Sequence, residues 1–194
     1  MKYNLSEITE VIKNRRTIYP QHYSSRVIHK EIIEHLLQNA TWAPTHGMTQ
    51  PWRFKIYTGE SRNALAESLS SLYKKLTPED QFREDKLLKI QARPFQSSAA
   101  IVVYMKRGDN PKIPEIEEIS SVACAVQNIC LTATAYGIGS FWSTPKVIYT
   151  PEMNEILKIR DQDKCMGIIY LGYPNEDWPK GQRKPIEYVT EWYN

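Results

Sequence analysis

The sequence lacks several features that would assign a function at once. No apolar run approaches the ~20 residues of a membrane-spanning helix, and no basic block of the kind that marks nucleic-acid binding is present. Gly137-Ile138-Gly139 lacks the third glycine of a dinucleotide-binding turn, and no Walker-type loop occurs. A nucleophile elbow is missing, and the four histidines do not have metal-ligand spacing. We therefore expect no metal, no nucleic acid and no membrane partner.

Cysteine is scarce as well. Cys124, Cys130 and Cys165 are an odd number without metal-type spacing, which predicts buried free thiols in a reducing compartment. Residues 1–7 lack the apolar stretch of a signal peptide. The sequence thus predicts a cytoplasmic protein.

Composition is ordinary for a globular chain, with 194 residues, 41% apolar and 24% charged residues, and a net charge of +3. Both signs of charge are spread along the chain. The length suits a single domain over residues 1–194, with an aromatic C-terminal arm over about residues 174–194 that has little periodicity of its own.

Hydrophobic periodicity predicts several helices and a few strands, so one sheet covered by helices is the natural arrangement. The run over residues 99–105 predicts a buried central strand. Thr77-Pro78 predicts a helix start, since a capping hydroxyl precedes proline. Other helices are expected near residues 5–12, 30–40, 61–76 and 114–136, and other strands near 52–57, 141–142 and 166–173.

The long helix at 114–136 is apolar nearly all round, and the aromatic arm cannot form a core alone. Together they exceed what one small sheet can cover, which favours an obligate homodimer in which the arm wraps the partner. A monomer with a central core helix is the alternative.

Four motifs suggest a ligand site. The loop over residues 43–54 combines two prolines, a glycine and hydrogen-bonding side chains, directly before a predicted strand. Arg15-Arg16-Thr17 and Arg183-Lys184 suit a phosphate, whose oxygens match guanidinium forks, although solvated surface patches would have the same composition. Residues 137–143 combine glycines, aromatics and hydroxyls suited to a flat ligand, or to an ordinary core strand.

Taken together, these motifs resemble those of the FMN-dependent nitroreductase family, in the compact single-domain branch that uses NAD(P)H. Arg15-Arg16-Thr17 is similar to the family's Arg-Arg-Ser, and residues 43–54 resemble its Ala-Pro-Ser and Gln-Pro-Trp-x-Phe motifs. Residues 137–142 resemble its Gly-hydrophobic-Gly turn, and Arg183-Lys184-Pro185 its Arg-Lys-Pro. The resemblance covers about residues 8–190.

The resemblance implies an α+β fold with a central, mainly antiparallel sheet, and a domain-swapped homodimer with one FMN per subunit at the interface. It implies that Arg15, Arg16 and Thr17, completed by Arg183 and Lys184, hold the FMN phosphate, that residues 141–143 form a wall along the flavin, and that Trp42 and His46 of the partner subunit close over the cofactor. Residues 131–136 would meet NADH or NADPH, and the FMN-binding positions would be Arg15, Arg16, Thr17, Trp42, His46, Phe141, Trp142, Ser143, Arg183 and Lys184.

The implied activity is reduction of flat electrophiles, such as nitroaromatics or quinones, by ping-pong hydride transfer from NAD(P)H through FMN. The chemistry would belong to the flavin, so no side chain need act as acid or base. Tyr19 and Met48 depart from the family pattern, which leaves open the group that faces the flavin's pyrimidine edge. Arg83, Lys86 and Arg107 are unranked candidates for an NADPH contact. Alternatives are a flavin-binding protein without turnover, and a different oxidation on the same scaffold.

Overall fold

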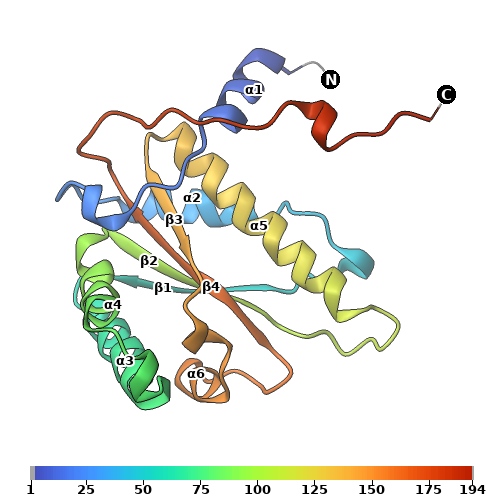
Figure 1. Cartoon of the computed structure of the whole chain (residues 1–194). Helices are drawn as coiled ribbons and strands as arrows, with labels where there is room; N and C mark the ends of the chain where they lie inside the picture. Colours follow the sequence, from blue (N-terminus) through green and yellow to red (C-terminus); the bar gives the residue numbers. More distant parts are fainter. Residues whose placement is uncertain (1–2, 194) are drawn as a thin grey trace.

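A four-stranded sheet forms the centre of the computed structural model, which describes residues 3–193 (Figure 1). The strand order is β1-β2-β4-β3, and every neighbouring pair is antiparallel. The expected α+β class with a mainly antiparallel sheet is therefore confirmed. The strands are β1 (Trp52–Thr58), β2 (Ala99–Met105), β3 (Gly139–Ser143) and β4 (Lys164–Gly172).

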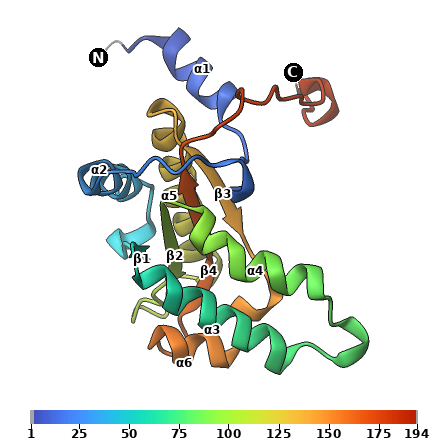
Figure 2. The same cartoon turned by 90° about the vertical axis from the view of Figure 1, so that its left-hand side faces the viewer.

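Helices cover both faces of this sheet. Figure 2 shows α2 and α5 on one face and α3 and α4 on the other. The helices within the described residues are α1 (Leu5–Asn14), α2 (Lys30–Ala40), α3 (Ser61–Leu76), α4 (Glu84–Gln96), α5 (Glu115–Ala135) and α6 (Pro151–Leu157). Short 3-10 turns are η1 (Pro20–His22), η2 (His46–Met48), η3 (Glu79–Gln81), η4 (Lys146–Tyr149) and η5 (Ile186–Tyr188). Across residues 3–193, no helix combines the length and apolarity that a membrane crossing needs.

Strand β2 is buried on both faces because the two helix layers enclose it. Ile101 and Val103 pack into a core shared with α2 and α5. Ala100 and Val102 point to the opposite face and pack with α3, α4 and α6. The continuous apolar run at 99–105 had predicted this central strand, and the prediction is confirmed.

Helix α5 is the longest element, and its ends follow from the sequence. Pro114 precedes its first turn in an extended conformation, and Gly137, at φ +67°, follows its last. Ala125 and Ile129 in its middle are fully buried against the sheet. The helix expected over residues 114–136 is therefore present.

The helix expected from Thr77 begins later than the sequence indicated. Thr77 and Pro78 are both extended, and the Thr77 side chain makes no capping hydrogen bond. Proline disfavours the helical conformation in the residue that precedes it, so Thr77 follows the end of α3 instead of starting a helix. The backbone N–H of Arg83 then donates to the Tyr73 hydroxyl at 3.0 Å, which ties down the loop before α4 begins at Glu84.

The segment after α1 is fastened to the ends of β3 and β4. The backbone N–H of Ile18 donates to the Ser140 carbonyl at 3.1 Å. Tyr23 is buried against Gly172, where a Cβ atom would lie 2.4 Å from the Tyr23 ring. The Tyr23 hydroxyl lies 2.7 Å from the Ile18 carbonyl oxygen and 3.1 Å from that of Tyr170. These contacts fix Arg15–Thr17 beside β3.

The Tyr23→Phe substitution tests this attachment. It removes one buried hydroxyl donor and leaves two carbonyl oxygens without it, so the free energy of unfolding should fall by about 1–2 kcal/mol. Urea denaturation followed by circular dichroism measures the change. The Tyr149→Phe variant, altered at an exposed side chain, is the control and should unfold like the unmodified protein. Equal midpoints for all three proteins would contradict the proposed anchoring.

Candidate cofactor site

A cavity of about 710 Å³ opens between the end of α1, the middle of α5, strand β3 and the C-terminal arm. Its volume lies within the usual range for a small-molecule site. We call it the arginine cavity. The residues that line it are Ile12, Lys13, Arg15, Arg16, Thr17, Ala123, Val126, Gln127, Cys130, Ser140, Trp142, Gly181, Gln182 and Arg183. The structure thus brings together five of the sequence-predicted site residues, from three distant segments.

Arg15 is a half-buried cation in this cavity. It directly follows α1, where the negative end of the helix dipole favours a positive charge. No carboxylate of the described residues pairs with its guanidinium, and no side-chain hydrogen bond to it occurs there. A guanidinium has five N–H donors, so Arg15 retains nearly all of its capacity to bind an anion.

Arg16 is held more tightly, yet one of its donors is also unpaired. Its Nη1 donates to the carbonyl oxygens of Lys13 and Arg15. Its Nε is buried and has no hydrogen-bond partner within the described chain. The arm packs directly on this guanidinium at Gly181, where a Cβ atom would lie 2.0 Å from Cζ. A buried N–H without a partner is costly, so a ligand oxygen here would satisfy it.

These observations test whether the residues fit a flavin nucleotide. A phosphate needs positive charge and donors, which Arg15, Arg16 and Arg183 in the cavity lining supply. A flat ring needs an apolar or aromatic wall, which Trp142 and Val126 supply. The indole Nε1 of Trp142 donates to the Met166 carbonyl at 2.9 Å, which fixes its orientation. The residues present fit FMN.

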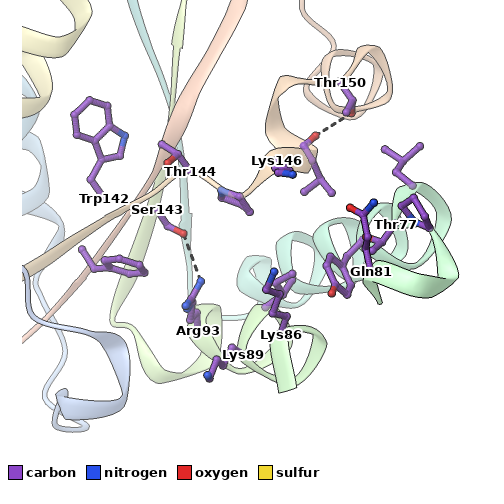
Figure 3. A pocket seen from close by; sticks show the side chains of 17 residues that line it. Thr77, Gln81, Lys86, Lys89, Arg93, Trp142, Ser143, Thr144, Lys146 and Thr150 are labelled. Carbon is purple, nitrogen blue, oxygen red and sulfur yellow. Dashed lines mark hydrogen bonds between the residues drawn. The ribbon is translucent and has the colours of Figure 1, made fainter. Parts of the chain in front are cut away.

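A second cavity of about 590 Å³ lies between α3, α4, β3 and η4. Figure 3 shows Lys86, Lys89 and Arg93 along α4, with Thr144 and Lys146 on the opposite wall. We call it the lysine cavity. Phe141, Trp142 and Ser143 line it, together with Tyr73, Leu76, Thr77, Pro78, Gln81, Ile90, Pro145, Val147 and Thr150. Trp142 lines both cavities, so they adjoin at this residue.

Arg93 is a site candidate that the sequence reasoning missed. Its guanidinium carbon lies 5.0 Å from the centre of the Phe141 ring, and its Nη1 donates weakly to the buried Ser143 hydroxyl at 3.5 Å. Tyr19 contacts the same ring, with centroids 4.8 Å apart. The available signal was helical spacing, because Lys86, Lys89 and Arg93 recur every three or four residues along α4.

Three predicted residues lie outside both cavities. Trp42 is 85% exposed after α2, and His46 pairs through Nδ1 with the Glu117 carboxylate on α5. Lys184 lies in a shallow pocket of the arm, with Nζ 5.9 Å from the centre of the Tyr188 ring. Within one described chain, therefore, nothing brings these three side chains to the arginine cavity, and their roles stay predictions.

The loop that contains His46 has an unusual backbone. Gly47, Met48 and Gln50 have φ values of +56°, +55° and +44°. Residues other than glycine rarely adopt this region. The backbone N–H of Gln50 donates to the Thr45 hydroxyl at 3.1 Å, which helps to hold this conformation. Strained backbone of this kind is concentrated at functional sites.

Residues 131–136 form the last turns of α5. Leu131, Thr132, Ala135 and Tyr136 line a third, shallower hollow between α1, α2 and α5. The Tyr136 hydroxyl lies 2.7 Å from Nδ1 of His35, which closes one side of that hollow. This segment does not line the arginine or the lysine cavity.

The cysteines behave as ordinary thiols. Cys130, in the wall of the arginine cavity, and Cys165, on β4, are buried and free, whereas Cys124 on α5 is free but only half-buried, so the expectation of burial is wrong for that residue. Burial raises the pKa of Cys130 and of Cys165, that of Cys165 to about 11. These two side chains are therefore protonated at neutral pH and are poor nucleophiles.

The fold and the arginine cavity together define a class: an α+β protein with an antiparallel sheet and a cavity whose residues suit a flat, anionic ligand. Comparisons with known proteins narrow this class to a family. The model of the Nitroreductase family matches residues 12–173. The chain is 31% identical over 144 residues to "Putative NAD(P)H nitroreductase YdjA" of Escherichia coli strain K12, an alignment that covers 74% of this chain and 76% of that protein.

Solved structures agree. A nitroreductase-like family protein from Bacillus cereus superimposes with a TM-score of 0.81 at 28% identity, over 100% of this chain and 98% of that one. The FMN-dependent nitroreductase NfnB from Mycobacterium smegmatis, solved in complex with NADPH, superimposes with a TM-score of 0.74 at 18% identity, over 98% and 100%. The chain belongs to the nitroreductase family. The prediction made from its motifs is confirmed, and with it the class of flavin-dependent oxidoreductase.

Proposed function

We propose that the protein is an FMN-dependent oxidoreductase that accepts hydride from NADH or NADPH and passes it to flat electrophiles such as nitroaromatics or quinones. One observation carries the proposal: Arg15 and the buried Nε of Arg16 lack partners in a cavity walled by Trp142. The names of the relatives support it, since one is called an NAD(P)H nitroreductase and another is FMN-dependent. The free cysteines also suit a reducing compartment, in agreement with a cytoplasmic protein.

The chain's own residues would bind and orient the cofactor. Arg15, Arg16 and Arg183 line the cavity and would hold the phosphate, and Thr17 adds a hydroxyl to the same lining. Trp142, whose orientation is fixed by Met166, forms a wall for the ring. FMN, when bound, supplies the acceptance and release of hydride. No acid or base is required of the protein in this assignment.

Because Tyr19 and Met48 depart from the family pattern, the group that faces the flavin's pyrimidine edge was left open, and Arg93 is a candidate for it. A reduced flavin carries negative charge at its pyrimidine edge, so a permanent cation nearby would stabilise that state. Arg93 lies against Phe141 and Ser143, two positions assigned to the flavin wall. Its guanidinium stays charged at every physiological pH, unlike a histidine. We assign it the role of facing the flavin's polar edge.

A second copy of the chain would complete the site. Helix α1 has no buried residue, and its apolar side chains Leu5, Ile8 and Ile12 are exposed. Figure 1 shows α1 and the C-terminal arm extending at the same end of the molecule. The arm exposes Ile186, Tyr188, Val189, Trp192 and Tyr193. Such surface is rarely left to water, which supports a homodimer whose arms wrap the partner.

The dimer also gives Trp42 and His46 their predicted place. Neither side chain lines the arginine cavity or the lysine cavity of its own chain, and both are exposed. In the arrangement that the family resemblance implies, they close over the partner's flavin. The alternative of a monomer would leave the exposed aromatic arm and α1 without any covering surface.

The proposed function predicts a spectroscopic property of the purified protein. It should carry the absorption bands of a flavin, and these should bleach when NADH or NADPH is added without oxygen. A nitroaromatic or a quinone should then restore the oxidised spectrum. Flavin that binds but is reduced by neither nucleotide would favour the non-turnover alternative. Protein that cannot be reconstituted with FMN at all would refute the proposal.

Arg15→Gln tests the phosphate assignment. Loss of one charge-assisted contact should raise the FMN dissociation constant about 10- to 100-fold. Because Arg15 has no ion pair or side-chain hydrogen bond among the described residues, the free energy of unfolding of the apoprotein should hardly change. Fluorescence titration of the apoprotein with FMN measures the affinity. Lys112→Gln removes an exposed charge outside both cavities and is the control; equal affinity in both variants would remove Arg15 from the site.

Ile8→Asp tests the dimer. A carboxylate on the exposed apolar face of α1 would have to be buried in the interface, so the dimer dissociation constant should rise at least ~10-fold. Analytical ultracentrifugation measures it. Val27→Asp, at another exposed apolar position, is the control. A sedimentation profile that stays unchanged in Ile8→Asp, or a monomeric unmodified protein, would contradict the dimer.

A further inference from the structure

We propose that the lysine cavity binds the anionic group of a flat ligand that reacts at the flavin. This inference rests on the proposed function and specifies the substrate class: ligands that combine an aromatic ring with negative charge. The carboxylate of an aromatic acid that accepts electrons and the phosphates of the nicotinamide nucleotide are the two sources of such a group.

The charge of the cavity carries the argument. Lys86, Lys89, Arg93 and Lys146 line it, and no aspartate or glutamate does. Neither Lys86 nor Lys146 forms an ion pair in the described part of the chain. A concave surface lined by one sign of charge concentrates ions of the opposite sign.

Lys89 remains available despite a nearby acid. Its Nζ lies 3.4 Å from Oδ2 of Asp85. That carboxylate is already held by both Nε and Nη2 of Arg83, at 2.9 and 2.8 Å. The stronger, two-pronged partner of Asp85 is therefore Arg83, and the weak exposed contact to Lys89 costs little to exchange for a ligand anion.

The rest of the wall suits a ring. Ile90, Val147 and Phe141 provide apolar surface next to the cations, and the hydroxyl of Thr144 adds a polar group. Apolar walls with a few convergent polar groups are typical of small-molecule sites. A fully polar anion, such as inorganic phosphate, would leave the apolar part of this surface unused.

The position of the cavity connects it with the flavin. Trp142 lines both cavities, and Arg93, assigned to the flavin's polar edge, lines the lysine cavity and donates to Ser143, the residue that follows Trp142 (Figure 3). A ligand whose charged group lies near Lys86 and Lys146 would therefore extend its ring toward Trp142. This arrangement would orient the ring by an electrostatic contact remote from the reacting atoms.

The structure also ranks the earlier candidates for a nucleotide phosphate. Arg83 is occupied by Asp85. Arg107 pairs with the buried Glu118 and donates to the Ile113 carbonyl. Of the three, Lys86 alone lines the lysine cavity and lacks an acidic partner among residues 3–193.

Charge reversal at the two unpaired lysines tests the proposal. Lys86→Glu and Lys146→Glu are compared with Lys74→Glu, an exposed lysine of α3 that does not line the cavity. Calorimetric titration of the flavin-loaded protein with 4-hydroxybenzoate, which accepts no electrons, reads binding alone. Each cavity variant should lose about tenfold or more in affinity, while Lys74→Glu should not. FMN content should be equal in all of them.

Half-reaction kinetics then separate the two sources. If the anion belongs to the acceptor, the variants need more 4-nitrobenzoate to reoxidise the flavin, whereas neutral 4-nitrobenzyl alcohol behaves as before. If it belongs to the nucleotide, half-maximal flavin reduction needs more NADH or NADPH instead. Either result supports the proposal, and the second assigns the cavity to the phosphates.

The proposal is overturned if 4-hydroxybenzoate binding and both half-reactions change no more in the cavity variants than in Lys74→Glu. The proposed function fails differently. In that case NAD(P)H does not bleach the flavin of the unmodified protein, whatever the lysine variants do. Lysine-dependent binding of 4-hydroxybenzoate without flavin reduction would leave an anion site and refute the assigned reaction.

Discussion

The unpaired positive charge beside β3 is the constraint on which the site depends. Arg15 and Arg16 lie where helix α1 ends and the chain turns onto the sheet. The backbone hydrogen bond from Ile18 to Ser140 holds this segment beside β3. Gly181 of the arm packs on the Arg16 guanidinium, so the C-terminal arm contacts the N-terminal segment at this cation. A buried N–H and a half-buried charge of this kind favour an anion, and in the proposed site FMN would supply one together with a ring.

Strand β3 determines how the two cavities relate. It lies at the edge of the sheet, so β4 covers only one of its sides. Thr17 bridges to Ser140 on the other side, which protects the edge and delivers the arginines. Phe141 packs with the core beneath α4, whereas Trp142 reaches the surface shared by both cavities. In the proposed assignment, the short run Ser140–Ser143 would contact the cofactor in one cavity and a ligand in the other.

Much of this was accessible from the sequence. The apolar run of β2, the ends of α5 and the arginine motif were read from local patterns, and the structure has them in place. The late start of α4 was not, because Tyr73 holds Arg83 through a contact that depends on how α3 packs. Arg93 was missed for the same reason. Its helical spacing with Lys86 and Lys89 indicates a shared face only, and the role of that face depends on the strand that the fold places opposite it.

The remaining surface argues that one chain is only part of the functional unit. Trp192 is 86% exposed near the end of the arm, and α1, at the same end of the molecule, exposes an apolar face (Figure 1). In the same chain, Trp42 and the strained loop around His46 are exposed, and contact with a second subunit would cover them. A second copy satisfies both conditions at once. The cofactor would then join the subunits, so that flavin binding and assembly stabilise each other by mass action.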